Sequence, residues 1–285
     1  MKSFWLVLLA TLAVVPALRV AAPGGAPAAL EAAYRANNVG VGLLEQFRHE
    51  EAAAEFRKAL VLAPGLGLAR ANLAIALLNE PKLDEARDEA RAAAAGLPGV
   101  AQPQYVLGLA ARGLGQGEEA QAAFRAVLAI DPRDVGARVN LGQLLLQDRH
   151  YPEAVEQLRA AVAAQPYNAT AVYNLGLALV RSGASEEGGR TMDRFKALKE
   201  SGFGTLLATS YPEQGRYAEA LVSTGAEADL VDAATPAVRL TDATARWLAP
   251  AAASPDHATA ATPASGDPAF QGRVTLADVD GDGRL

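Results

Sequence analysis

The sequence predicts an all-α protein, and both its composition and its internal repetition support this fold class. Alanine fills nearly a quarter of the 285 positions, and alanine is the strongest helix former and a poor strand residue. Apolar residues make up 51% of the chain, which is enough to build a core. A 34-residue period that begins at residue 33 is the most specific observation. Such a period indicates stacked helical units.

Several columns of this repeat stay in phase over five units, and their chemistry describes two antiparallel helices that cross closely. Position 8 is small in every unit: Gly40, Ala74, Gly108, Gly142 and Gly176. Position 20 is also small: Ala52, Ala86, Ala120, Ala154 and Gly188. Position 24 is mostly larger: Phe56, Ala90, Phe124, Leu158 and Met192. We expect the helices to cross at positions 8 and 20, with position 24 filling the space beside the crossing.

The ends of the second helix in each unit are also marked. Acidic residues occupy positions 18 and 19, where carboxylates favour the positive end of the helix dipole. They are Glu50 and Glu51, Asp84 and Glu85, Glu118 and Glu119, Glu153 after Pro152, and Glu186 and Glu187. Proline at position 32 cannot donate to a helical ladder and stops the helix. These prolines are Pro64, Pro98, Pro132 and Pro166.

The order of these columns resembles the tetratricopeptide repeat (TPR) family. The resemblance implies a right-handed superhelix of helix-turn-helix repeats over residues 33–236, with about six repeats. Residues 211–220 look like the turn and second-helix start of the sixth unit, which we expect to cap the stack.

In such a superhelix the first helix of each repeat lines the concave face, where position 6 carries a recurring asparagine. Asn38, Asn72, Asn140 and Asn174 occupy it, and Val106 interrupts the series. A carboxamide both donates and accepts, so it matches a peptide backbone whatever the side chain. The family contains superhelices that hold extended peptides with such a ladder. The alternative is that Asn-Leu-Gly is simply frequent in this repeat.

Other candidate peptide-binding residues in the same groove are Tyr105, Tyr173, Arg112 and Arg181. The expected ligand is an extended protein segment of mixed polarity. A second series of arginines stands at position 25, namely Arg57, Arg91, Arg125 and Arg159. We favour a solvated outer helix face for these arginines over a functional basic stripe.

Residues 1–22 have the features of a signal peptide: Lys2, an apolar run from Phe4 to Val15, and small residues after Pro16. Cleavage is expected after residue 22 or residue 28, and an uncleaved membrane anchor is the alternative. We therefore expect an exported protein, placed in the periplasm, at the cell surface or outside the cell.

Several classes of function are disfavoured by the composition. A net charge of −6 argues against nucleic-acid binding, and the absence of cysteine excludes disulfides and thiolate chemistry. The three histidines, His49, His150 and His257, lack metal-ligand spacing and a nearby nucleophile motif. Asn168 begins a glycosylation sequon, but its position suits a helix cap. We expect a protein that is not an enzyme.

The composition changes after residue 236. Residues 237–269 combine a possible short strand with a Pro/Ala-rich linker. A second strand-like run, residues 273–277, leads into Asp278, Asp280 and Asp282, followed by Gly283. This D-x-D-x-D-G spacing matches the first half of a calcium loop, and an ordinary acidic turn is the alternative. Because the later ligands are absent, the Ca²⁺ site is incomplete.

Residues 270–285 resemble the opening of an FG-GAP/VCBS repeat, the blade unit of calcium-binding β-propellers; a dockerin-type loop is the competing resemblance. The order of segments is similar to the N-terminal part of exported bacterial TPR–FG-GAP/VCBS proteins of the ASPIC/UnbV type, so we expect a longer protein with a truncated first blade here. The implied function is a non-enzymatic scaffold that binds a protein or peptide partner in the concave groove. Alternatives are the recognition arm of a larger extracytoplasmic enzyme or adhesion protein, and an assembly adaptor in the cell envelope.

Overall fold

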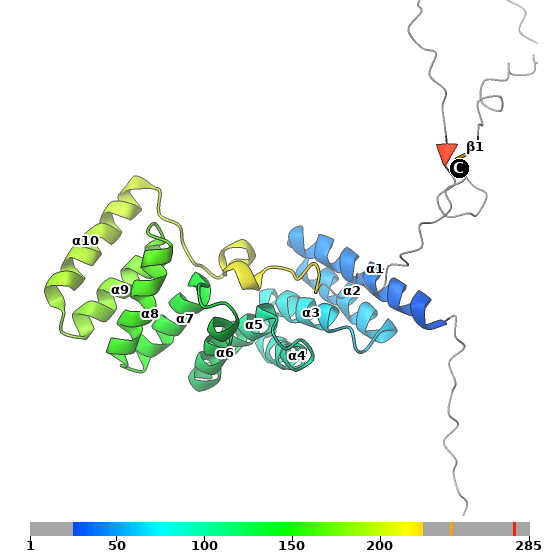
Figure 1. Cartoon of the computed structure of the whole chain (residues 1–285), viewed down its shortest axis with the longest axis horizontal. Coiled ribbons are helices and arrows are strands. Elements are labelled where there is room, and N and C mark those ends of the chain that lie inside the picture. Colours follow the sequence, from blue (N-terminus) through cyan, green and yellow to red (C-terminus); the bar gives the residue numbers. More distant parts are fainter. Residues whose placement is uncertain (1–24, 225–239, 242–275, 278–285) are drawn as a thin grey trace, which may run out of the picture. The chain divides into compact units, whose positions relative to one another are not determined.

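The computed structural model describes residues 25–224, 240–241 and 276–277. The chain divides into two compact units, residues 1–225 and 226–285. Within the described residues, the first unit contains ten α-helices (Figure 1). They are α1 Gly25–Glu45, α2 His49–Leu62, α3 Gly67–Asn79, α4 Leu83–Gly96, α5 Ala101–Gly113, α6 Gly117–Ile130, α7 Val135–Gln147, α8 Tyr151–Ala164, α9 Ala169–Arg181 and α10 Ser185–Ser201.

The ten helices form five successive pairs, and each helix packs against the next along the stack. First helices also contact each other across the pairs: α1 with α3, α3 with α5, and α7 with α9. A hydrogen bond from Asn140 of α7 to Tyr105 of α5 joins the two groups. We call the surface built from α1, α3, α5, α7 and α9 the first-helix face. The predicted all-α superhelix is therefore confirmed for the described helices.

The small residues at position 8 lie where the two helices of a pair cross. A Cβ atom on Gly108 would approach the ring of Phe124 to 2.8 Å, and one on Gly142 would approach Leu158 Cγ to 2.6 Å. Real Cβ atoms do not come this close to their neighbours. Both partners are position-24 residues, so the predicted crossing is confirmed.

Helix ends follow the predicted signals. The acidic residues lie in the first turn of α2, α4, α6, α8 and α10, and α2, α4, α6 and α8 each end before the position-32 proline. Asn168 caps α9 as predicted, because its side chain accepts a 2.9 Å hydrogen bond from the Ala171 amide. Asp134 caps α7 in the same way.

The position-25 arginines connect consecutive pairs on the outer surface. Arg57 lies 3.0 Å from Glu85, Arg91 lies 2.6 Å from Glu119, and Arg159 lies 2.8 Å from Glu187. Arg125 and Glu153 are 4.0 Å apart. Each arginine thus pairs with a helix-start acid of the following repeat. These side chains are about half exposed, as expected for a solvated outer face.

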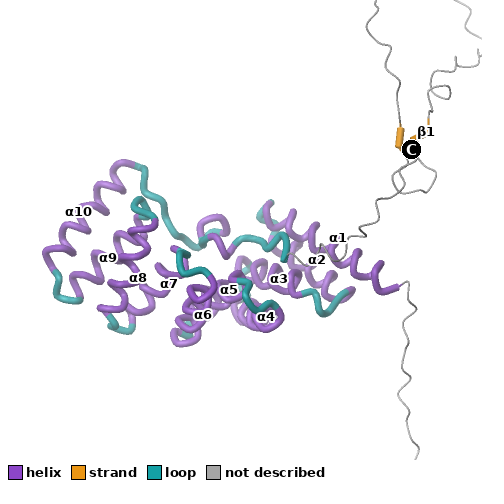
Figure 2. The backbone as a smooth tube through the Cα atoms, in the orientation of Figure 1, coloured by secondary structure: helices purple, strands orange, loops and turns teal. Residues whose placement is uncertain are grey.

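The prediction of a sixth helical repeat after α10 is wrong. The helix α10 ends at Ser201, and Gly202 adopts a left-handed conformation with φ 72°. Residues 203–224, which we call the return segment, then run back along the stack without forming an α-helix (Figures 1 and 2). They contain two short 3₁₀ turns, Tyr211–Glu213 and Arg216–Ala218. Gly215 separates the turns with φ 115°, a backbone conformation that no helix accommodates.

The second unit contains a two-stranded antiparallel ladder in its described residues. Strand β1, Leu240–Thr241, pairs with β2, Leu276–Ala277, in the register Leu240 to Ala277. Both lie in the runs for which the sequence predicts strands, and the propeller-blade resemblance stays a prediction. The predicted leader (residues 1–22), most of the linker, and Asp278, Asp280 and Asp282 lie outside the described residues. No described helix has the length and apolar character needed to cross a membrane.

Candidate functional site

The first-helix face is occupied along much of its length by the return segment. Thr205 meets the start of α9, the second 3₁₀ turn packs on α5, and Leu221 reaches α3. The segment therefore runs antiparallel to the order of the repeats, from the last pair back toward the first (Figure 2). Five of its side chains are buried: Tyr211, Gln214, Tyr217, Ala218 and Leu221. The candidate site consists of the first-helix face together with this segment.

Asn72 binds the return segment through both polar atoms of its amide. Its Nδ2 donates to the Leu221 carbonyl at 2.9 Å, and its Oδ1 accepts from the Leu221 amide at 2.8 Å. Asn72 is completely buried, so the recognised backbone is shielded from water. The amide matches both hydrogen-bonding groups of one residue, as expected for backbone recognition by asparagine.

Asn38 takes no part in this contact. It is exposed, whereas its neighbour Asn37 is completely buried and accepts a 3.0 Å hydrogen bond from Asn72 Nδ2. In the first repeat the inward-facing asparagine is thus one position earlier than the 34-residue alignment indicates. The sequence signal for this shift is the adjacent pair of asparagines, Asn37 and Asn38. The 34-residue alignment selects Asn38.

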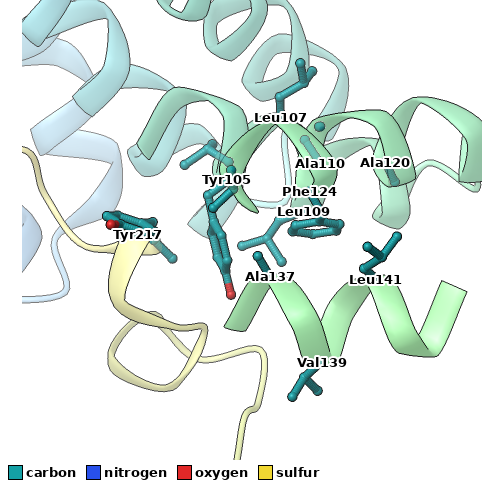
Figure 3. Close-up of a cluster of buried hydrophobic side chains, with 14 of the residues drawn as sticks. Tyr105, Leu107, Leu109, Ala110, Ala120, Phe124, Ala137, Val139, Leu141 and Tyr217 are labelled. Atoms are coloured by element: carbon teal, nitrogen blue, oxygen red, sulfur yellow. The ribbon is translucent and has the colours of Figure 1, made fainter. Parts of the chain in front are cut away.

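Tyr105 connects α5, α7 and the return segment (Figure 3). Its hydroxyl donates to the Gln214 carbonyl at 2.7 Å and accepts from Asn140 Nδ2 at 3.2 Å. Its ring lies 5.5 Å from Phe124 in an edge-on geometry and 6.3 Å from Tyr217. Burial raises the pKa of the Tyr105 hydroxyl, which therefore stays protonated and able to donate.

A pocket of about 600 Å³ remains open beside the return segment. It brings together four predicted residues, Arg112, Asn140, Asn174 and Arg181, from α5, α7 and α9. Its remaining walls come from the first-helix face and the return segment: Leu109, Gln143, Leu146, Gln147, Leu177, Leu207, Ala208, Thr209 and Gln214. The lining combines amides and cations with leucine side chains, which suits a ligand of mixed polarity.

The arginines give this pocket a positive character. The Arg112 guanidinium donates to the side-chain oxygens of Asn140 and Gln143, both neutral acceptors. Burial lowers the pKa of Arg112, although an arginine stays charged at neutral pH. Among the described residues neither Arg112 nor Arg181 has a carboxylate within ion-pair distance. No aspartate or glutamate lines this pocket among the described residues.

Tyr173 lies apart from the other predicted residues. Its side chain is 43% exposed, and its ring packs 5.1 Å from Phe195 of α10. Asn174, the next residue, is buried and donates to the Thr170 carbonyl at 2.7 Å.

Three contacts at the site were missed by sequence reasoning. Thr170 Oγ1 accepts from the Leu207 amide at 3.0 Å, Tyr217 donates to Asp131 at 2.9 Å, and Tyr211 donates to Glu45 at 2.8 Å. Burial and the Asp131 bond raise the pKa of Tyr217 to about 12. The spacing of the two tyrosines predicts the turn and second-helix start of a sixth repeat, so their role in the return segment has no separate sequence signal.

The described residues contain no cluster of three His, Asp or Glu side chains able to hold a metal ion. His49 begins α2 and His150 precedes α8, on separate repeats. His257 lies outside the described residues.

Comparisons with known proteins agree with this architecture. A family model for the tetratricopeptide repeat matches residues 105–169 and 140–201. No curated protein matches the chain. The solved structure of YrrB, titled a TPR protein with an unusual peptide-binding site, is 22% identical, with a TM-score of 0.53 over 58% of this chain and 85% of YrrB.

Two solved structures of MamA are also similar. MamA 41-end from Desulfovibrio magneticus RS-1 is 20% identical, with a TM-score of 0.56 over 60% of this chain and 97% of that protein. A second MamA structure is 17% identical, with a TM-score of 0.55 over 60% of this chain and 93% of that one. At these identities the likeness shows the fold. Residues 105–201 match tetratricopeptide repeats, and the described helices have the fold of a TPR-like superhelix.

Proposed function

We propose that this protein is a non-enzymatic interaction scaffold whose first-helix face binds an extended segment of a partner protein. The observation that carries the proposal is the two-way pairing of the Asn72 amide with the backbone of Leu221. Both hydrogen bonds are made to main-chain groups, so this contact does not select the side chain of the bound residue. The same face thus has the chemistry to hold an extended segment from another protein.

The open pocket is the most accessible place for such a segment. Asn140 and Asn174 line it with Arg112 and Arg181, and its leucines offer apolar surface for intervening side chains. The similarity of fold to YrrB, described as a TPR protein with an unusual peptide-binding site, is consistent with this use of the pocket.

A displayed library of random peptides tests the proposal. The wild-type chain should enrich peptides whose binding weakens about tenfold when Arg181 and Gln147 are both replaced by alanine. Both side chains are exposed at the pocket, so their loss leaves the core intact. Arg190→Ala, on α10 and away from the pocket, is the matched control. Failure to enrich any peptide, or binding unaffected by the pocket variant, contradicts the proposal.

The proposal includes an exported location, supported by the leader-like residues 1–22. Fusion of this leader to a reporter that is active only outside the cytoplasm should give activity, and replacement of Leu8 and Leu9 by arginine should abolish it. Cytoplasmic retention of the unaltered fusion counts against export.

Calcium binding by Asp278, Asp280 and Asp282 is a separate part of the proposal, supported by their spacing. Titration calorimetry of the chain with Ca²⁺ should show a weak site. Replacement of the three aspartates by asparagine should remove it. If the wild-type chain and the substituted chain give the same heat of Ca²⁺ binding, the result counts against the site.

A further inference from the structure

The return segment carries a sequence pattern that fits the first-helix face at both main chain and side chains. We propose that it is an intramolecular ligand of this face, and that the face selects segments of the form Tyr-x₃-Gly-Arg-Tyr-Ala-x₂-Leu, as found in residues 211–221. This inference rests on the proposed function and names the class of ligand and the way its binding is regulated.

Main-chain contacts hold the segment at three separated places. Thr170 Oγ1 accepts from the Leu207 amide at 3.0 Å, the Tyr105 hydroxyl donates to the Gln214 carbonyl at 2.7 Å, and Asn72 pairs with Leu221. The three contacts come from α9, α5 and α3. They fix the direction and register of a bound segment without reading its side chains.

Side-chain contacts supply the selectivity. Gly215 passes directly over the Tyr105 hydroxyl, so that a Cβ atom there would collide with the oxygen, and its φ of 115° also disfavours any other residue. Ala218 is completely buried, so a larger side chain would have to displace packed neighbours. These two positions exclude most sequences on steric grounds.

Charged and hydroxyl groups of the segment add attractive contacts that favour its sequence. The Tyr217 hydroxyl donates to Asp131 at 2.9 Å, and the neighbouring Arg216 guanidinium lies 3.5 Å from the same carboxylate. Tyr211 donates to Glu45 at 2.8 Å. Each tyrosine of the pattern thus meets one acidic acceptor, Glu45 at the end of α1 and Asp131 in the turn between α6 and α7. Leu221 adds an apolar anchor that is 6% exposed.

An outside ligand must compete with a segment that is covalently attached. A tethered ligand experiences an effective concentration in the millimolar range for a short connection. The apparent affinity for an outside peptide falls by the fraction of molecules whose face is free. We infer that the α3–α5 part of the face is closed in the resting protein and opens when the return segment leaves.

The experiment uses the full chain with its return segment weakened by Gly215→Ala. The probe is a fluorescent synthetic peptide of residues 207–223, and binding is followed by anisotropy. The Gly215→Ala protein should bind the peptide at least about tenfold more tightly than wild type. Val222→Ala, at a return-segment position that is 72% exposed, should behave like wild type. Adding Asn72→Ala to Gly215→Ala should remove binding.

The peptide itself carries the second half of the test. Alanine in place of the glycine that corresponds to Gly215, or in place of the tyrosine that corresponds to Tyr217, should abolish binding to the Gly215→Ala protein. Hydrogen exchange on amides 214–221 measures release of the segment in each protein. A second protein variant, Tyr211→Ala combined with Tyr217→Ala, releases the segment independently of glycine.

Three results would overturn the inference. One is equal binding of the peptide to wild type and to a variant with a released segment, and another is no binding to either released variant. The third is that neither variant exposes amides 214–221, which makes the segment a fixed part of the fold. If library peptides still bind the open pocket, the proposed function survives these results; if they also fail to bind, both proposals fall.

Discussion

The asparagines at position 6 of the repeat differ widely in their burial and in their hydrogen-bond partners, although they share one column of the alignment. Asn72 is buried and satisfied by Asn37 and by the backbone of Leu221. Asn140 and Asn174 each donate to a carbonyl one turn earlier in their own helix. Asn38 is exposed. Asparagine has a low helix propensity, which costs free energy inside a helix. Only the asparagines with buried hydrogen-bond partners offset this cost.

Replacement of Asn72 by alanine should therefore destabilise the protein by about 1–3 kcal/mol, since the amide and carbonyl of Leu221 lose their buried partner. Asn38→Ala should change the free energy of unfolding by much less. Urea titration of both variants measures the difference, and hydrogen exchange at the Leu221 amide localises it. Equal effects of the two substitutions would show that Asn72 does not hold the return segment.

Asp131 gives the attachment of the return segment a pH dependence. The Arg133 amide and the Tyr217 hydroxyl hold the pKa of this carboxyl below its usual range. A carboxyl whose pKa is lowered by folding stabilises the native state above its ordinary pKa of about 3.9 and loses this effect as the pH falls through the lower native value. Burial shifts the pKa of the nearby Asp134 upward, so that residue contributes in the opposite sense.

Asp131→Asn isolates the contribution of Asp131. At neutral pH the variant should unfold at a lower temperature than wild type, and the two curves should converge as the pH falls through the lowered native pKa and Asp131 becomes protonated. Thermal unfolding from pH 7 to pH 2.5 tests this. Asp193→Asn, which removes an exposed carboxylate on α10, serves as the comparison. A constant difference across the range would mean that the Asp131 charge is not involved.

At the level of helices, the close crossing explains why position 8 accepts only small residues. In α1, a Cβ atom on Gly40 would lie 2.5 Å from Phe56, whereas one on Gly42 would have no neighbour within 4 Å. The two glycines thus provide a matched pair inside one helix.

Gly40→Ala should destabilise the protein by about 1–3 kcal/mol, because the Phe56 ring must move in a packed core. Gly42→Ala should instead stabilise it by about 0.5–1 kcal/mol through the better helix propensity of alanine. Chemical denaturation of the two variants decides between packing and propensity. Stabilisation by both substitutions would contradict the crossing geometry.

Elements with a local or periodic signal were predictable from the sequence, and the return segment was not. The crossing glycines, helix-start acids and stop prolines each act through neighbours one turn or one repeat away, so a 34-residue alignment reveals them. Tyr211, Gly215 and Tyr217 resemble the turn and second-helix start of a further unit, two residues early in the register. Their actual partners are Glu45 in the first unit of the alignment, and Tyr105 and Asp131 in the third. No repeat pattern encodes contacts of that range.

Across the first unit as a whole, the return segment changes how repeats depend on each other. A stack of repeats is stabilised by contacts between neighbours, so its ends can unfold separately. Here Leu207 bonds to α9, Tyr211 to α1 and Leu221 to α3. One continuous segment therefore links the last pair to the first two, and partial unfolding at either end also breaks contacts at the other.

Gly215→Ala should consequently lower the cooperativity of unfolding as well as the stability. With the segment released, terminal repeats can unfold before the centre, and the denaturant slope m should fall because each step exposes less surface. Circular dichroism would follow the helices, while a fluorophore at position 222 would follow the segment. The two transitions should coincide in wild type and separate in the variant. Val222→Ala should keep the wild-type slope, and an unchanged slope in a variant with a released segment would show that neighbour contacts alone make the stack cooperative.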